Sequence, residues 1–585
     1  MKLYILILLT FTLNIFAQIN PSLMIKDGDK TYPLKLSNLK INTKIIGNVA
    51  KTEIEFKFFN SLDKIIQGDF IFPLNENDSV YKFGLDINGE IREGVIVEKN
   101  KGQEVFENVV RKNIDPGLLE KTIGNNYKTH IYPIPAKGYK TVIIGYEHEL
   151  LNKDKNYLYS IPFKFDNKID LFSLNIETLN QNVEPVLSKN ELINVKFTKK
   201  DNSYILNYTN ENFSLNNLDF LIPKIENDSK LIVEYDEVTK NNYFYVNFTP
   251  KLLTKEKVFP KKLCLFIDSS LSAMNRDITK EIELISKYAK ILNNFTIEFA
   301  QFGNVVETSD SFVIKNGDIA NITKKIKDIK YDGGTQLGAI NFNNYKCDEI
   351  ILSTDGISNF GDNEIKISKT PVIVINSSKS AEHSYLKYVS QKTNGIYINL
   401  NILSVEEALK KLSVNNYGFI GYEFNKGDIE EIYPSLPTNI TKNFSFAGIL
   451  LKDSVKIKVN FGFGNNVVYS ELVEINKKNL TSSEIAKRFY AKKKIAELET
   501  EHEKNKEEIL KLGQKFGIVT RNTSLIILEN IEDYIKYKII PPKSMQEEYF
   551  AVIEAEKTEL KENEAEHIEQ VIEKFNAVKE WWDTK

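Results

Sequence analysis

Short segments of alternating apolar and polar residues fill the first 150 positions of the chain. Alternation with period two is typical of strands with one buried face, and Asp86-Ile87-Asn88-Gly89 has the composition of a turn between two strands. The clearest strand-like segments in this region are residues 54–58, 69–72, 95–97 and 141–144. We therefore predict an antiparallel β-sandwich over residues 22–150. Similar segments at 157–161 and 243–248 predict further strands over residues 151–256.

From Lys262 the pattern changes to apolar runs that alternate with helical spacing. Apolar residues repeat every three or four positions over residues 278–292, and they dominate the strand-like segments 263–267, 295–302, 349–352 and 371–375. Continuous apolar strands that alternate with helices are typical of a parallel sheet covered on both faces. We therefore predict a doubly wound, Rossmann-like α/β domain over residues 258–400.

β-rich sequence resumes after the α/β domain and continues over residues 402–478. The simplest explanation is that the α/β domain is inserted into one β domain. The two halves of that β hub domain would then be residues 151–256 and 402–478. The whole chain is predicted to be a multidomain protein that combines all-β and α/β units.

The last hundred residues are predicted to form helices and one strand. A charged helix is predicted over 483–512 and a strand over 523–528, so residues 482–542 form a helix-strand segment that Pro541-Pro542 ends. Residues 544–585 are rich in Glu and Lys and predict an amphipathic helical tail. Its apolar stripe comprises Ile568, Val571, Ile572, Phe575, Val578 and Trp582. We expect this stripe to pack on the protein itself, and the alternative is a helix that binds a partner.

Length and charge narrow the possible functions. A chain of 585 residues is too long for a single hydrophobic core, which agrees with several domains. The 77 Lys and Arg residues nearly balance the 80 Asp and Glu residues, so the chain lacks the excess positive charge that nucleic-acid binding requires. Cys264 and Cys347 are the two Cys residues, which excludes a Cys-rich zinc module. We expect both to be free thiols in buried strands.

The first 17 residues have the features of a secretory signal peptide. Lys2 precedes an apolar run that ends at Phe16, and cleavage is predicted after Ala17. The run is shorter than the ~20 residues that cross a bilayer, and no later segment predicts a transmembrane helix in the mature chain. The sequence therefore predicts a secreted, periplasmic or cell-surface protein. Its bias to Lys, Asn and Ile is typical of an AT-rich bacterial genome.

Candidate metal ligands follow two strands of the predicted α/β sheet. Asp268-Ser269-Ser270-Leu271-Ser272 comes after the first strand, Thr354-Asp355-Gly356 comes after residues 349–352, and Gly333-Gly334-Thr335 lies in a loop between them. The carboxyl ends of parallel strands meet at the edge where α/β sheets bind ligands. Carboxylate and hydroxyl oxygens together suit a hard divalent cation such as Mg²⁺.

The sequence does not contain a recognisable catalytic motif. None of the five His residues has the His-Glu-x-x-His spacing of a metalloprotease, and no Gly-x-Ser-x-Gly or phosphate-loop motif occurs. The sequence offers no nucleophile with an adjacent base. We therefore expect a protein that binds rather than an enzyme.

The α/β segment resembles the von Willebrand factor type A (VWA) domain, whose metal-ion-dependent adhesion site (MIDAS) has the same Asp-x-Ser-x-Ser, Thr and Asp pattern. The resemblance implies that Asp268, Ser270 and Ser272 hold the metal and that Thr335 and Asp355 complete its surroundings. Mg²⁺ is the expected ion, with Mn²⁺ and Ca²⁺ as alternatives. One coordination position would remain for an Asp or Glu carboxylate of a protein partner.

Two departures from the family pattern affect the surroundings of this site. Leu271 and Ala273 stand where Gly and Met are frequent in the family. The short stretch between Thr335 and Asp355 implies a short connecting helix. Neither departure removes a ligand.

The first 150 residues resemble the vault protein inter-alpha-trypsin (VIT) domain. The resemblance is carried by Phe72-Pro73-Leu74, Gly94 to Lys99, Gly117-Leu118-Leu119-Glu120 and Ile143 to Tyr146. A VIT domain followed by a VWA domain is the arrangement of inter-alpha-trypsin inhibitor heavy chains, which residues 482–542 also resemble. The heavy chains transfer to hyaluronan through an Asp-Pro-His segment. That tripeptide is missing here, so this activity is not implied.

Together these features predict an exported, non-enzymatic adhesion protein that binds an acidic group of a partner protein through a Mg²⁺ ion. The alternative is a structural cell-envelope or self-assembling scaffold component in which the metal only stabilises the fold.

Overall fold

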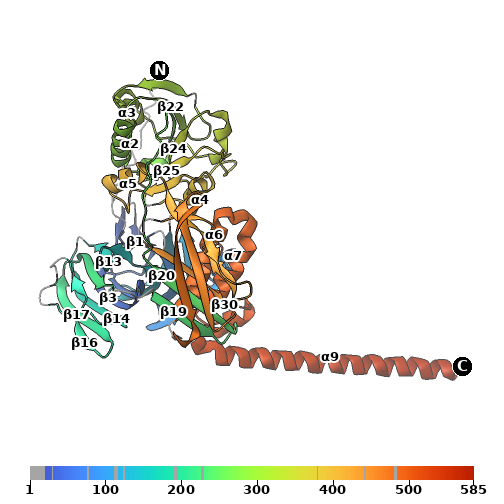
Figure 1. Ribbon diagram of the computed structural model, residues 1–585. Helices are drawn as coiled ribbons and strands as arrows, with labels where there is room; N and C mark the ends of the chain where they lie inside the picture. Colours follow the sequence, from blue (N-terminus) through green and yellow to red (C-terminus); the bar gives the residue numbers. More distant parts are fainter. Residues whose placement is uncertain are drawn as a thin grey trace, which may run out of the picture.

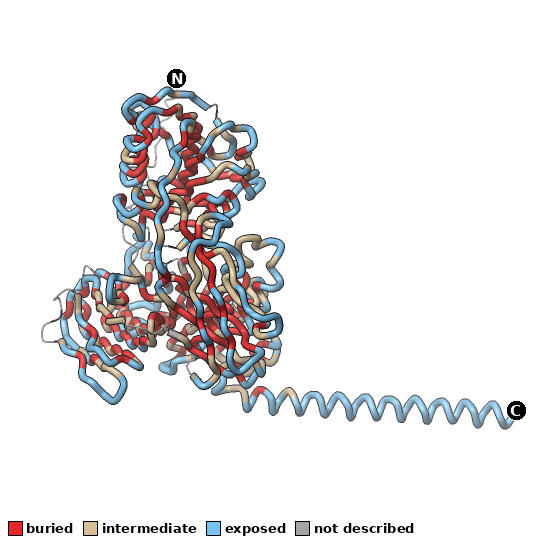
Figure 2. Tube along the Cα trace, in the orientation of Figure 1, coloured by how far each residue is buried: buried red, intermediate tan, exposed pale blue. Residues whose placement is uncertain are grey.

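The computed structural model describes residues 20–585 except 29, 76–77, 111–115, 123–124, 166, 189–191, 193–194, 225–229, 308, 379, 441–442 and 480–483. The signal peptide predicted for residues 1–17 lies outside this set. The described chain is mostly β-structure, with an α/β unit above a group of β-sheets and one long helix that projects from them (Figure 1). Buried residues are concentrated inside the α/β unit and the β-sheets, whereas α9 is exposed along nearly all of its length (Figure 2).

Two large sheets pack face to face in the N-terminal part of the chain. The first has the order β2 (Lys30–Pro33), β1 (Ser22–Asp27), β5 (Ile66–Pro73), β10 (Asn126–Ile134), β9 (Gly117–Thr122), β33 (Thr523–Ile527) and β8 (Val95–Glu98). The second has the order β16 (Thr198–Lys200), β17 (Ser203–Phe213), β14 (Ile169–Leu179), β3 (Lys35–Ile46), β4 (Val49–Phe59), β11 (Tyr139–Glu149), β6 (Ser79–Ile87) and β7 (Glu90–Glu93). Helix α1 (Lys99–Val110) follows β8 and packs on β33 and β9.

Aromatic side chains join these two sheets into one core. Phe56 and Phe58 alternate with polar residues along β4, as the period-two pattern predicts, and both are buried. The ring of Phe56 lies 5.4 Å from that of Phe70 in the facing sheet, and the ring of Phe58 lies 6.0 Å from it. Aromatic pairs at such distances stabilise a core beyond the effect of area alone. The four strand segments predicted in this region are confirmed.

The assignment of residues 151–223 to the hub domain was wrong. These residues contribute β14, β16 and β17 to the second N-terminal sheet, and β14 pairs in parallel with β3 from Leu171↔Asn38 to Leu179↔Ile46. They also form a smaller sheet with the order β12 (Leu151–Lys153), β13 (Asn156–Lys164), β18 (Asn216–Pro223) and β15 (Val186–Leu187). Alternation along a strand shows which face is buried but does not reveal the neighbouring strand.

The β hub contains strands from both sides of the α/β unit. One sheet has the order β19 (Lys230–Asp236), β20 (Asn241–Phe248), β30 (Phe444–Leu450) and β28 (Ile429–Tyr433). The other has the order β29 (Thr438–Asn439), β27 (Tyr417–Glu423), β31 (Ser454–Phe463) and β32 (Asn466–Asn476). Because β20 pairs with β30 from Asn242↔Leu450 to Phe248↔Phe444, the chain returns to the hub after the α/β unit.

The α/β unit has a six-stranded sheet that is covered on both faces. Its order is β23 (Asp310–Ile314), β22 (Phe295–Phe302), β21 (Lys262–Asp268), β24 (Glu349–Ser353), β25 (Val372–Asn376) and β26 (Ile396–Asn399). Its helices are α2 (Ile278–Leu292), α3 (Ala320–Lys327), α4 (His383–Lys392) and α5 (Val405–Leu412). Leu265 and Phe266 of β21 are buried in different clusters, one on each face of the sheet. This double burial explains the continuous apolar run.

The segment between Thr335 and Asp355 contains two short 3-10 turns, η2 (Leu337–Ala339) and η3 (Phe342–Asn344). The short connecting helix expected there is therefore reduced to single turns.

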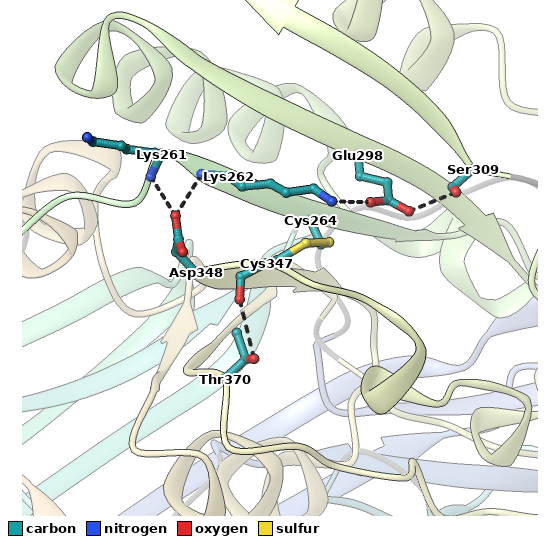
Figure 3. The surroundings of a disulfide bond; sticks show 8 residues. All are labelled: Lys261, Lys262, Cys264, Glu298, Ser309, Cys347, Asp348 and Thr370. Carbon is teal, nitrogen blue, oxygen red and sulfur yellow. Dashed lines mark hydrogen bonds and ion pairs between the residues drawn. A yellow bond between two sulfur atoms is a disulfide. The ribbon is translucent and has the colours of Figure 1, made fainter.

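The expectation of two free thiols was also wrong, because Cys264 and Cys347 form a disulfide bond (Figure 3). Their Cα atoms lie 5.9 Å apart, although 83 positions separate them in sequence. Cys264 lies near the start of β21, and Cys347 precedes the neighbouring strand β24. The bond joins adjacent strands near the end of the sheet opposite Asp268, and sequence spacing alone could not reveal that pairing.

Replacement of both cysteines by serine is expected to lower the free energy of unfolding of the α/β unit by about 3–4 kcal/mol, because a bond that closes a long loop restricts the unfolded chain. Thermal unfolding of the full chain, with and without the substitutions, measures the change. Two free thiols per chain in the unreduced, unfolded wild-type protein would contradict the bond itself.

The helix-strand segment connects the hub to the N-terminal sheets. The single helix predicted over 483–512 is divided into α6 (Ile485–Leu498) and α7 (His502–Phe516) by a 3-10 turn, η5 (Glu499–Glu501). Helix α6 packs on the hub, where the ring of Phe489 lies 4.9 Å from that of Tyr245. The predicted strand is β33, which inserts between β8 and β9 of the N-terminal sheet. Helix α8 (Ile531–Lys536) follows it.

The predicted helical tail is α9 (Gln546–Asp583), which runs away from the rest of the molecule (Figures 1 and 2). Tyr549 is the one buried residue of this helix. The expectation that its apolar stripe packs on the same chain was therefore wrong, since the stripe residues are 52–71% exposed. None of the helices in the described part of the chain is long and apolar enough to span a membrane.

Candidate metal centre

Asp268 stands at the carboxyl end of β21, and its carboxylate is held on both oxygens. The backbone N–H of Ser270 donates to Oδ1 at 2.9 Å, and the hydroxyl of Thr354 donates to Oδ2 at 2.5 Å. The hydroxyls of Ser270 and Ser272 lie 3.2 Å apart in the turn that follows β21. The Asp-x-Ser-x-Ser segment is therefore a compact turn that gathers three oxygen-bearing side chains.

Asp355 lies beside this turn because β24 is the parallel neighbour of β21. Ile267 and Ser353 are paired in the register, so the residues that follow them leave the sheet at the same edge. The N–H of Ile357 donates to Oδ1 of Asp355 at 3.0 Å, whereas Oδ2 is buried without a hydrogen-bond partner. One carboxylate oxygen of Asp355 is thus free to bind a cation.

The loop that carries Thr335 is fastened to the turn after β21. The N–H of Leu271 donates to the carbonyl of Gly333 at 3.1 Å, and the N–H of Asp332 donates to the carbonyl of Ser269 at 3.1 Å. Thr335 itself is buried, and its hydroxyl oxygen has no hydrogen-bond partner. All five residues named from the motif therefore lie on adjoining segments at one edge of the sheet.

The electrostatics of this edge favour a bound cation. Burial and the nearby charge of Asp268 raise the pKa of Asp355 to about 6. A divalent ion beside Asp355 would offset the unfavourable effect of burial and of the Asp268 charge on its carboxylate. The two unpartnered oxygens, on Asp355 and Thr335, are buried polar atoms that such an ion would satisfy. The donor set fits Mg²⁺, whose ligands are mainly oxygens.

A buried ion pair stabilises the turn that follows β21. The guanidinium of Arg276 donates to Glu281 Oε2 at 3.1 Å, and both side chains are fully buried. A second guanidinium nitrogen donates to the backbone carbonyl of Asp268 at 2.9 Å. Ser353 and Ser377, near the ends of β24 and β25, donate hydroxyl hydrogen bonds to the same Glu281 carboxylate. This network connects the turn to α2 and two strands.

The sequence interpretation missed this network. One signal was available, because Glu281 falls on the apolar face of the helix predicted over 278–292, where a charge requires a buried partner. Nothing in the sequence identifies Arg276 as that partner.

Four exposed apolar side chains lie on the loops that carry or adjoin the candidate metal residues, and together they are called the apolar rim: Leu271 (57% exposed), Met274 (47%), Val305 (65%) and Phe360 (59%). Backbone hydrogen bonds fix their loops to the site. Besides the bond of Leu271 to Gly333, the N–H of Phe360 donates to the Thr335 carbonyl at 3.2 Å. The N–H of Gly303 donates to the carbonyl of Val305, and the N–H of Gln336 donates to the carbonyl of Gly303. These bonds connect the Val305 loop to the residue that follows Thr335. A partner at the metal residues would therefore meet large apolar groups.

Among the described residues, a different group also has metal-ligand geometry: Cys264, Glu298 and Cys347 offer ligand atoms within 4.8 Å of one another. The disulfide bond occupies both sulfurs, and Glu298 is paired with Lys262 at 3.1 Å (Figure 3). This group is therefore a covalent cross-link rather than a candidate metal site.

Comparisons with known proteins agree with both resemblances. Residues 36–146 match the vault protein inter-alpha-trypsin domain family, which confirms the VIT domain predicted for this region. A von Willebrand factor A domain-containing protein of Dictyostelium discoideum is 22% identical over 509 residues and covers 79% of this chain. The chain spans 54% of that relative's length.

Two solved structures share parts of the fold at low similarity. The ArnB paralog VWA2 from Sulfolobus acidocaldarius is 15% identical and covers 52% of this chain and 87% of its own, with a TM-score of 0.24. A von Willebrand factor type A protein from Catenulispora acidiphila is 10% identical and covers 51% and 91%, with a TM-score of 0.25. At TM-scores this low, neither likeness supports an inference about function.

Proposed function

We propose that this chain, in which a VIT domain is followed by a VWA-like α/β unit, is an exported adhesion protein that binds a carboxylate of a protein partner through a Mg²⁺ ion. Asp268, Ser270, Ser272, Thr335 and Asp355 would hold the ion. The ion would supply a positive charge with one position open to an Asp or Glu side chain of the partner. This is a binding function and includes no catalytic step.

The observation that carries the proposal is the pair of buried oxygens without hydrogen-bond partners, on Asp355 and Thr335. Buried polar atoms are nearly always satisfied in folded proteins, so two such atoms beside a second carboxylate favour a bound cation. The surrounding groups position the ligands: Thr354 and the Ser270 N–H orient Asp268, and the Ile357 N–H orients Asp355.

Export is the part of the proposal that the disulfide bond supports. Disulfides persist in oxidising compartments outside the cytosol and are rare within it. The bond between Cys264 and Cys347 agrees with the signal peptide expected from the sequence. We therefore propose a secreted, periplasmic or cell-surface location.

The metal site is tested by calorimetric titration of the full chain with Mg²⁺. Wild-type protein is expected to release or absorb heat with about one site per chain, and Asp355→Ala is expected to abolish that heat because it removes the unpartnered oxygen. Glu283→Ala is the matched control, because Glu283 is an exposed acid on helix α2, outside the loops of the site. Circular dichroism of each variant checks its fold.

The proposal is wrong if the wild-type chain binds no divalent ion. Equal binding by wild type and Asp355→Ala would place the ion elsewhere in the molecule. Weak binding of Mg²⁺ together with stronger binding of Mn²⁺ or Ca²⁺ would retain the site and change its ion.

A further inference from the structure

The last two turns of α9 combine acidic and large apolar side chains. Glu580 and Asp583 flank the two adjacent tryptophans, which are 53% and 71% exposed. Phe575 and Val578 precede Trp582 on one face of the helix, at spacings of three and four residues. Exposed tryptophans are unusual on a free surface and are enriched at binding interfaces.

The metal centre presents the complementary chemistry. A bound divalent cation would attract one carboxylate, and the apolar rim around it would receive large hydrophobic side chains. The end of α9 therefore offers carboxylates and aromatic side chains in a single segment.

Basic residues of α9 add a second complementarity. Asp332 and Glu307 are exposed on the loops around the metal centre. Lys579 precedes the tryptophans, and Lys585 follows them with its Nζ 3.9 Å from the Trp581 ring centroid. Residues 554–567, the glutamate-rich part of the helix, lack large apolar groups other than Leu560 and would be repelled by the same loops. These charges favour the end of α9 over its middle.

In this structure, α9 cannot place its last residues, 575–583, on the metal centre of its own chain. Tyr549 fixes the start of α9 in a cluster with Leu118, Ile526 and Tyr534 of the N-terminal part. From there the helix extends away from the α/β unit (Figure 1). Its 38 residues are about 57 Å long at 1.5 Å per residue. The end of α9 and the metal centre therefore lie far apart on one molecule.

We infer that the end of α9, residues 575–583, docks on the metal centre and apolar rim of a second copy of this chain. The inference rests on the proposed metal-dependent binding and names its partner. Because the docking segment and the site are different surfaces, the contact is heterologous, and repetition produces open chains or closed rings rather than a symmetric dimer. Each copy would bind one neighbour through its site and another through its helix.

Sedimentation velocity of the full chain tests the assembly. With excess Mg²⁺ the wild-type protein is expected to form species larger than a dimer as its concentration rises, and EDTA is expected to return it to monomers. The double substitution Trp581→Ala/Trp582→Ala should abolish assembly in Mg²⁺. Leu560→Ala is the matched control, because it removes a 62% exposed apolar side chain from the same helix outside the docking segment.

Mixing two defective variants gives the sharpest result. Asp355→Ala keeps the docking segment but loses the site, and Trp581→Ala/Trp582→Ala keeps the site but loses the segment. Each should be monomeric alone, and a mixture of the two should form one-to-one dimers and nothing larger. A symmetric helix-to-helix contact would instead fail in this mixture, because one partner lacks the tryptophans.

Four outcomes would overturn the inference. Mg²⁺ binding by calorimetry without assembly would refute this partner and leave the proposed metal site intact. Assembly that persists in EDTA would show that the helix docks elsewhere. Unchanged assembly after Trp581→Ala/Trp582→Ala would exclude the docking segment. A chain that binds no Mg²⁺ would overturn the proposed function together with this inference.

Discussion

Replacement of Arg276 by alanine is expected to destabilise the α/β unit by about 3–5 kcal/mol, because it leaves the fully buried carboxylate of Glu281 without its ion pair. The same substitution removes the hydrogen bond to the Asp268 carbonyl, which supports the turn of the metal centre. Hydrogen exchange of the β21 and β24 amides in the full chain measures the local free energy of unfolding.

The control for this prediction is the exposed pair on the same helix turn. Lys280 lies 3.4 Å from Asp277, with both side chains about half exposed, and Lys280→Ala should change the free energy of unfolding by less than about 0.5 kcal/mol. The double substitution Arg276→Met/Glu281→Leu should recover much of the loss, since it removes both charges. A loss below about 1 kcal/mol for Arg276→Ala would show that the carboxylate is solvated.

Acidification is expected to destabilise the N-terminal sheets through His148. Its ring stacks between Tyr146 and Tyr159 at 5.5 Å and 5.8 Å, and its Nδ1 is buried without a hydrogen-bond partner. Burial, with a smaller effect of the Lys492 charge, lowers the pKa of His148 to about 3. The unfolded residue binds a proton near its ordinary pKa of 6.5 and the folded residue does not, so protons favour unfolding between these values.

The stability that neutral His148 contributes is therefore fully present above about pH 6.5 and is lost as the pH falls toward 3, by about 5 kcal/mol in total. Asp78 acts in the opposite direction, because burial raises its pKa to about 7 and its contribution is lost as the pH rises. Comparison with His148→Phe at each pH isolates the histidine. Urea unfolding of both proteins should diverge below pH 6.5, and parallel pH profiles would refute the prediction.

Local features of the fold were predictable from the sequence. The bounds predicted for α2 and β22 agree with the structure, because helical spacing and apolar runs depend on neighbouring residues. Helix α2 also begins where its sequence provides a cap, since the side chain of Asp277 accepts from the Lys280 N–H at 3.1 Å. The residues proposed as metal ligands were found for the same reason, as three short segments that each follow a recognisable pattern.

Features that depend on the meeting of distant segments were not predictable. The parallel pairing of β14 with β3, the disulfide and the ion pair of Arg276 with Glu281 join segments whose own sequences do not specify a partner. The exposure of α9 was likewise not predictable from the sequence. An amphipathic stripe shows that a helix has an apolar face, but whether that face meets the same chain or another molecule depends on the position of the helix.

The insertion of β33 also determines when the VIT domain can be completed during synthesis. Its neighbours β8 and β9 end at Glu98 and Thr122, and β33 starts at Thr523, so about 400 residues are made in between. At roughly 5–20 residues per second, this corresponds to roughly 20–80 s of waiting. During that time β8 and β9 have unpaired edges, the surfaces on which chains aggregate or chaperones act. The first domain to emerge is therefore among the last to close.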